Sequence, residues 1–332
     1  MISRVLHSGY VAALTVLVLL LALPFARAAD VEQQVQDEYR GKALVLRGFY
    51  SGDRLAYDAS GLAMGYPAMG DWTTDGLVLV DQIRISDGSV KISAGRLLVF
   101  NGKNGFQFDG GGKKNKKPKK WGTVEIEATL PSDNPSLDQL EGLLANVFLT
   151  SQDSLADLVP EYWNPCIRDG MEGKNAACRF SAELLEVPGI AARTSSSQPA
   201  SSQAGSSQAA ASSEPELKST NSPIGPGANL SGPVPDGTYH VGHGVSPPHL
   251  LYSPEPRFTE LARQSKHGGT VTLSLIVNAE GRPTKIRVSA PFGCGLDVNA
   301  VQTVSAWRFS PAMKDGKPVA VHIQVEVDFH LY

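Results

Sequence analysis

The sequence has few cysteines, few aromatic side chains and no excess of positive charge. Its 332 residues include three cysteines, too few for the disulfide framework of a small secreted domain. Aromatic residues make up 7% and the formal net charge is -3, so we expect no nucleic-acid partner, which would require basic surfaces or stacking platforms. A hydrophobic fraction of 42%, with 33 glycines and 22 prolines, is typical of globular domains rich in turns and joined by linkers.

One long uncharged apolar run stands near the start of the chain, Tyr10–Leu23. Its length of about fourteen residues is short of the ~20 that a membrane-spanning helix needs. The Ala-Arg-Ala sequence ending at Ala28 has the small–x–small pattern of a signal-peptidase site. We therefore predict that residues 1–28 are a signal peptide, cleaved between Ala28 and Ala29, and that the chain is exported. The alternative is an uncleaved membrane anchor.

Export makes the cysteines informative, because disulfides persist outside the cytoplasm. Cys166 and Cys178 flank a segment containing Gly and Asn, and we predict that they form a local disulfide. Cys294 lies between two glycines, and we expect it to fill a tight turn as a small residue.

The middle of the chain predicts a disordered linker over residues 191–246. Residues 194–213 contain no charged and no aromatic side chain, and Ser-Ser-Gln recurs every five residues. Such a segment cannot bury enough apolar surface to offset its chain entropy. The Pro- and Gly-rich residues that follow continue the tether, which could span over ~100 Å if pulled straight.

Residues 40–190 predict a β-rich α+β domain of unknown role. Two hairpins are expected, the first around a Ser-Gly-Asp turn and the second around Asp87-Gly88, the strongest short hairpin signal in the chain. A further strand alternates apolar and polar residues. The expected strands are Lys42–Tyr50, Arg54–Asp58, Leu77–Ser86, Ser89–Phe100 and Thr123–Leu130.

The apolar period then changes to that of a helix between Leu137 and Phe148. Pro135 suits its first turn, and a second short helix is expected after Ser154. Between two of the strands lies Lys113–Lys120, with six lysines in eight residues. This segment is either a solvated loop or a contact with the phosphates of an anionic envelope surface.

Residues 247–332 predict a domain with the order α-β-β-α-β and a small antiparallel sheet covered on one face. The last strand alternates most regularly, with apolar residues at every second position from Val319 to Leu331. The expected elements are a helix over Glu255–Lys266, strands starting near Val271 and Pro283, a helix over Leu296–Trp307 and the final strand.

Several spaced motifs make this domain recognisable. They are Ser253–Phe258, Gly269-Thr270-Val271, the sequence NAEGRPTKIRV, Gly295-Leu296-Asp297, Ala306–Ala312 and Asp315–Val319. Together they resemble the C-terminal domain of the TonB energy-transducer family, over about a quarter of the chain. The resemblance implies structural roles for Pro254, Gly269, Gly281, Leu296, Asp297, Trp307, Phe309, Pro311 and Gly316.

The resemblance also implies a function. Members of this family pair the edge of their last strand with a segment of an outer-membrane TonB-dependent transporter, which is β-augmentation, and transmit energy from an inner-membrane proton-driven motor complex. It places the chain in the periplasm or cell envelope. By this likeness the partner-binding residues are Val319, Val321, Ile323, Val325, Val327 and Phe329.

Two departures keep an alternative open. The leader looks cleavable, and the linker is rich in Ser, Gln and Ala where the family has a stiffer, Pro-rich spacer. The alternative is therefore an exported envelope adaptor that uses the same domain as a passive docking module. A third hypothesis tethers a hydrolase or sugar-binding domain to such a module.

No pattern in the sequence indicates catalysis. Motifs of serine hydrolases, zinc proteases and phosphate-binding loops are absent from the sequence, so we expect a protein that is not an enzyme and uses no cofactor. His240 and His243 form an H-x-x-H pair that is incomplete as a metal site, and no metal is expected. His322 and His330 are expected on the polar face of the last strand.

Overall fold

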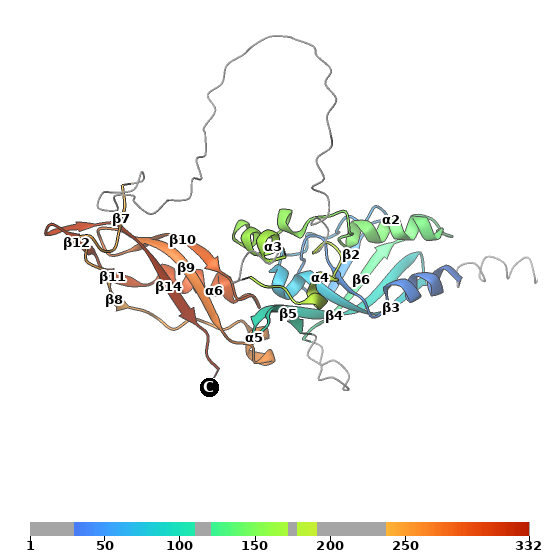
Figure 1. Cartoon of the computed structure of the whole chain (residues 1–332). Coiled ribbons are helices and arrows are strands. Elements are labelled where there is room, and N and C mark those ends of the chain that lie inside the picture. Colours follow the sequence, from blue (N-terminus) through green and yellow to red (C-terminus); the bar gives the residue numbers. More distant parts are fainter. Residues whose placement is uncertain (1–29, 110–120, 172–177, 191–236, 332) are drawn as a thin grey trace, which may run out of the picture.

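The computed structural model describes residues 30–109, 121–171, 178–190 and 237–331. Figure 1 shows two folded parts, an N-terminal domain coloured blue to yellow-green and a C-terminal domain coloured orange to red. Both combine sheets with short helices, so the expected α+β fold class is confirmed. In these ranges, no helix is long and apolar enough to cross a membrane.

A sheet of six strands forms the centre of the N-terminal domain as described. Its spatial order is β1-β3-β4-β6-β2, and β5 pairs with β4. The longest antiparallel pairs join β4 to β3 and to β6, so β4 is the central strand of the sheet. The strands are β1 Ala43–Val45, β2 Arg54–Tyr57, β3 Leu77–Ser86, β4 Ser89–Gly102, β5 Gly105–Asp109 and β6 Thr123–Thr129.

The hairpin expected around Asp87 and Gly88 is confirmed. β3 and β4 pair directly across these two residues, whose φ angles are 53° and 71°, as a two-residue type I′ turn requires. The alternating strand β6 is confirmed as well, because it buries every second side chain. Local sequence signals were sufficient for both elements.

The hairpin expected between β1 and β2 is wrong. β1 pairs antiparallel with β3, whereas β2 pairs parallel with β6, at the far side of the sheet. Both strands are short, and each pairs with a longer strand, β1 with β3 and β2 with β6, instead of with the other. Burial in the tertiary structure therefore overrides the Ser-Gly-Asp turn between them.

The helices of the N-terminal domain pack around this sheet. α2, Leu137–Val147, begins at Ser136, whose side chain forms a capping box with Gln139, so Pro135 stands before the cap and not in the first turn. After Ser154 a short 3-10 turn follows as expected. The other elements are the π-helical turn η1 Trp72–Gly76, the 3-10 turns η2 Leu155–Asp157 and η3 Glu161–Trp163, and the helices α3 Asn164–Met171 and α4 Ala182–Leu185.

Residues 30–39 also form a helix, which the sequence analysis left outside the domain. Its Gln36 side chain accepts a hydrogen bond from Ile83 N, and its Glu32 side chain accepts one from Ile85 N, both at 2.8 Å. This helix therefore covers the part of β3 that β1 does not reach. The N-terminal domain thus starts before residue 40.

The C-terminal domain is built on a four-stranded sheet with the order β10-β9-β14-β7. Helices α5 and α6 supply apolar side chains to the core on one face of the sheet, as the sequence predicts. Two small two-stranded sheets, β8–β11 and β12–β13, complete the domain. The elements are β7 Tyr239–His240, β8 His249–Tyr252, α5 Glu260–Ser265, β9 Thr270–Val277, β10 Pro283–Ala290, α6 Leu296–Ser305, β11 Arg308–Ser310, β12 Ala312–Lys314, β13 Lys317–Val319 and β14 Val321–Asp328.

Two expected boundaries in this domain are wrong. The first helix does not start at Glu255, because prolines occupy the preceding segment and Thr259 supplies the cap from which α5 begins. The last strand is not continuous from Val319, because Ala320 interrupts it and separates β13 from β14. β13 instead turns back onto β12.

The two domains are in contact, which the linker model did not predict. Phe100 on β4 forms a β-bridge with Gly293 in the loop before α6. Asn101 N donates to Phe292 O at 2.7 Å, and Cys294 N donates to Val99 O at 2.9 Å. The end of β4 therefore pairs through its backbone with the loop before α6, and this short pairing joins the two domains.

Candidate functional site

The open edge of β14 is the candidate binding site. Along its whole length β14 pairs antiparallel with β9. On its other side it pairs only with β7, at Val321 and His322. In the part of the chain that the structure describes, no strand pairs with residues 323–328 on that side. An edge of this kind can accept an added strand.

Backbone groups of alternate residues point to the open edge. Ala320 O accepts a hydrogen bond from Tyr239 of β7, whereas Phe329 N donates to Gly269 O on the β9 side. In an antiparallel pair both backbone groups of a residue face the same neighbour, and the register of β14 is unbroken. The N–H and C=O groups of Gln324 and Glu326 therefore face the open edge.

β7 shows how a strand fits this edge. It runs parallel to β14, with Tyr239 opposite Val321 and His240 opposite His322. Its two residues occupy only the start of the edge. A longer strand in the same direction would have six further residues of β14 beside it, from Ile323 to Asp328.

The six residues expected to bind a partner do not all lie on this edge strand. Val321, Ile323, Val325 and Val327 lie on β14. Val319 belongs to β13, where it pairs with Ala312, and Phe329 follows the end of β14 with its side chain 1% exposed. Val321 and Val327 are buried, whereas Ile323 and Val325 are partly exposed, so these two could contact an added strand.

The residues of the recognised motifs lie in the core and in the turns of the C-terminal domain. Leu296, Trp307 and Phe309 belong to its hydrophobic core. Gly281 has φ +74°, and a Cβ there would collide with the backbone oxygen of Phe309. A Cβ at Gly269 would collide with the ring of Phe292, so both glycines permit close packing.

The other motif residues stand between elements. Pro254 lies in the segment between β8 and α5, and Pro311 separates β11 from β12. Gly316 has φ +76° in the turn between β12 and β13, with open space around its α-carbon. Its role is therefore conformational, because a residue with a side chain is strained at that angle.

Asp297 holds the loop at the domain contact. Its carboxylate accepts hydrogen bonds from Phe292 N at 2.7 Å and from Gly293 N at 3.2 Å, and the residue is fully buried. Burial raises the pKa of Asp297 to about 8, although the two backbone donors oppose this shift. The same loop carries Cys294, whose burial raises its thiol pKa, so this cysteine fills the turn as an unreactive group.

A second acidic residue approaches this loop from the N-terminal domain. Gly295 N donates a 3.0 Å hydrogen bond to Thr73 Oγ1, and the Thr73 hydroxyl in turn donates to the Asp71 carboxylate. Burial raises the pKa of Asp71 as well. Around the contact, His267 Nε2 lies 3.0 Å from Asp109 and its ring stacks on Phe100.

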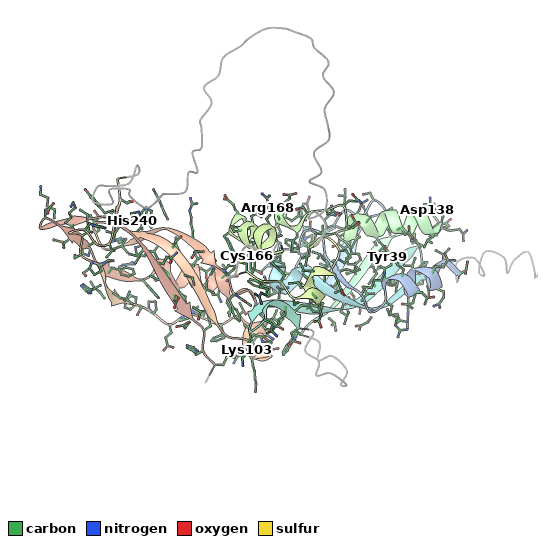
Figure 2. The ribbon with its side chains drawn as sticks, in the orientation of Figure 1. Tyr39, Lys103, Asp138, Cys166, Arg168 and His240 are labelled. Atoms are coloured by element: carbon green, nitrogen blue, oxygen red, sulfur yellow. A yellow bond between two sulfur atoms is a disulfide. The ribbon has the colours of Figure 1, made fainter. Side chains whose placement is uncertain are left out.

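The remaining expectations fall elsewhere. Cys166 of α3 and Cys178 are joined by a disulfide in the core of the N-terminal domain, and Figure 2 labels Cys166. Ala28, Ala29 and Lys113–Lys120 lie outside the described residues.

The C-terminal part is thus a small α+β domain with a covered face and one incompletely paired edge. Residues 254–331 match the family model described as the Gram-negative bacterial TonB protein C-terminal. This segment is therefore a TonB-type C-terminal domain.

Two characterised proteins are similar to the same segment. The protein TonB of Vibrio cholerae serotype O1 is 33% identical over 78 residues, which cover 23% of this chain and 32% of that protein. Protein tonB2 of Pseudomonas aeruginosa is 37% identical over 82 residues, covering 24% and 30%. The aligned region is about a third of the length of these relatives, so the likeness describes one domain of each.

Among solved structures, the solution NMR structure of the Pseudomonas aeruginosa TonB CTD matches with 22% identity. The match covers 27% of this chain and 89% of that structure, with a TM-score of 0.22.

Sequence reasoning missed the contact between the domains and the strand β7. The disordered linker expected over residues 191–246 is therefore wrong at its end, because β7 and the buried Val245 belong to the C-terminal domain. The signal for the contact was the Gly-Cys-Gly turn, in which Gly293, Cys294 and Gly295 all have positive φ. Such a strained turn lets one backbone approach another closely. β7 left no signal, because a two-residue strand is too short to show a period.

Proposed function

We propose that this chain is a TonB-like protein of the bacterial cell envelope that binds outer-membrane transporters by strand pairing and transmits proton-motive energy for uptake. The single observation that carries the proposal is the edge of β14, which is open from Ile323 to Asp328 on a domain of TonB type. The protein acts by binding and not by catalysis. Its proposed partners are a TonB-dependent transporter and an inner-membrane motor complex.

The proposed organisation gives each segment a part. Residues 1–28 direct export, residues 191–236 connect the two domains, and the C-terminal domain, which includes β7, meets the transporter. An incoming segment extends the sheet beside β14 in the direction that β7 already takes. Main-chain hydrogen bonds from Gln324 and Glu326 supply affinity, and the partly exposed Ile323 and Val325 supply selectivity.

A proline substitution at Glu326 tests this pairing. Proline lacks the N–H that faces the open edge, whereas it removes no hydrogen bond to β9, and edge strands tolerate it. We expect Glu326→Pro to weaken binding to a purified outer-membrane TonB-dependent transporter by about tenfold or more, as measured by biolayer interferometry. The matched control Glu326→Thr keeps the N–H and retains binding.

Equal binding by the proline and threonine variants, with both still folded, would refute strand pairing at this edge. The alternative function, a passive envelope adaptor, is favoured by the direct contact between the two domains. Sequencing the N-terminus of the exported protein separates the two functions, because a chain that starts at Ala29 has no membrane attachment through which to be pulled.

A further inference from the structure

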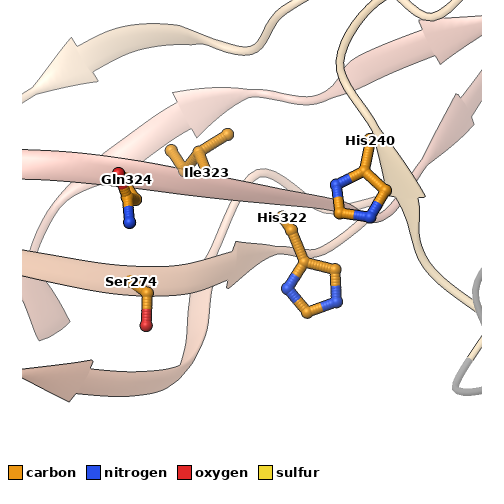
Figure 3. A pocket seen from close by; sticks show the side chains of 5 residues that line it. All are labelled: His240, Ser274, His322, Ile323 and Gln324. Carbon is orange, nitrogen blue, oxygen red and sulfur yellow. The ribbon is translucent and has the colours of Figure 1, made fainter. Parts of the chain in front are cut away.

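Two histidines from separate elements lie side by side on the polar face of the C-terminal sheet. Parallel pairing sets His240 of β7 opposite His322 of β14. Their ring centroids are 5.7 Å apart, and the ring planes are inclined by 26°. Figure 3 shows the two imidazoles next to each other at a surface cavity of about 360 Å³, which Ser274, Ile323 and Gln324 also line.

The spacing of the rings suits a shared metal ion. Imidazole nitrogen is a preferred donor for Zn²⁺, Ni²⁺ and Cu²⁺, with a nitrogen–metal distance of about 2.0–2.1 Å. Each ring centroid then lies about 3 Å from the ion, so two rings that share one are separated by up to about 6 Å. The ring torsion of histidine is broad, and His240 is exposed, so its ring can turn a nitrogen toward the shared position.

We propose that His240 and His322 form a binding site for a divalent transition-metal ion of the imidazole-preferring class. Gln324 lies two residues along β14 and lines the same cavity, so it and water are available for the remaining coordination positions. In the described part of the chain, no group of three or more His, Cys, Asp or Glu side chains could hold a metal. The site therefore has two histidine ligands and open positions, and its ion is exchangeable.

This assignment differs from the H-x-x-H pattern in the sequence. That pattern pairs His240 with His243, whereas the structure places His322, which is 82 positions further along the chain, opposite His240. Only the fold brings the second pair together.

A bound ion would also fix β7 to β14. The two strands share a short ladder in which Tyr239 N donates to Ala320 O at 2.8 Å. Because one ligand comes from each strand, the ion cross-links them at the start of the open edge. The inference does not rest on the proposed function, since the site is defined by β7 and β14 alone.

Isothermal titration calorimetry of the untagged exported chain with ZnCl₂ and with NiCl₂ tests the site. We expect saturable binding of one ion, and we expect His240→Ala and His322→Ala each to lower the association constant by about tenfold or more, because a chelate of two ligands becomes a single ligand. His330→Ala is the matched control, since His330 follows the same strand outside the cavity, and it should bind as the wild type does. Zn²⁺ should also slow hydrogen exchange of the Tyr239 amide in the wild type and not in His322→Ala.

Two results would overturn the proposal. One is the absence of saturable binding for either ion up to about 1 mM, the range of the weakest specific sites. The other is loss of binding in His243→Ala with full binding in His322→Ala, which would assign the ion to the sequential pair. Thermal unfolding of each variant shows whether it is folded, so a folding defect is distinguished from a lost ligand.

Discussion

The contact between the two domains depends on Gly293, because any side chain at this position would push the loop before α6 away from β4. Gly293 has φ +94°, and a Cβ there would collide with the carbonyl oxygen of Val99 on β4. We predict that Gly293→Ala opens the contact while both domains remain folded. Gly316→Ala is the matched control, because Gly316 has φ +76° with open space around it.

The size of the effect follows from the bonds that the collision breaks. Both substitutions cost about 1–2 kcal/mol for the left-handed backbone, so this contribution cancels in the comparison. Gly293→Ala additionally separates Asn101 N from Phe292 O and Cys294 N from Val99 O. At about 0.5–1.5 kcal/mol for each hydrogen bond, the contact loses roughly 1–3 kcal/mol more than in the control.

Hydrogen exchange on the full chain measures this loss residue by residue. The amides of Asn101 and Cys294 should exchange about 5- to 150-fold faster in Gly293→Ala, since 1.4 kcal/mol corresponds to a factor of ten. The amides of β9 and β14 should stay protected, which shows that the C-terminal sheet is intact. Unchanged protection of Asn101 and Cys294 in a variant confirmed by sequencing would refute the reasoning, because the contact would then not require this close approach.

Three further predictions concern the pH dependence and stability of the chain. Burial raises the pKa of Asp297 to about 8 in the folded state, so its contribution to the free energy of unfolding is greatest below the ordinary aspartate pKa of about 4 and declines as the pH rises to about 8. In urea unfolding at several pH values, the free energy of unfolding should fall less steeply with pH in Asp297→Asn than in the wild type. An equally steep fall in both would contradict the assignment. Reduction of the Cys166–Cys178 disulfide, which spans 12 positions, should destabilise the N-terminal domain by about 2–3 kcal/mol, and an unchanged unfolding midpoint after reduction would contradict this. Ser136→Ala removes the cap of α2 and should cost about 1 kcal/mol, whereas Ser136→Thr, a residue that can also cap, should retain most of the stability.

The elements that could be predicted from the sequence are those with local causes. Asp87 and Gly88 adopt the conformations that specify the β3–β4 hairpin. Ser136 and the leucine stripe after it specify α2, and the alternation within β9 and β14 specifies two neighbouring strands. In each case the information lies within about ten residues of the element itself.

The features that could not be predicted depend on distant parts of the chain. β2 pairs with β6, about seventy residues further along, and its own four residues carry no mark of that partner. The open edge was expected from family resemblance, but its true extent was not, because the break at Ala320 and the pairing with β7 are tertiary features. The site of His240 and His322 is hidden in the sequence for the same reason.

The hydrogen bond between Gly295 and Thr73 joins positions 222 residues apart, and it changes what the connecting segment can do. The 46 residues from 191 to 236 could reach about 150 Å at full stretch, yet the domains that they join already touch. A force that pulls the two domains apart therefore acts first on the hydrogen bonds of this contact.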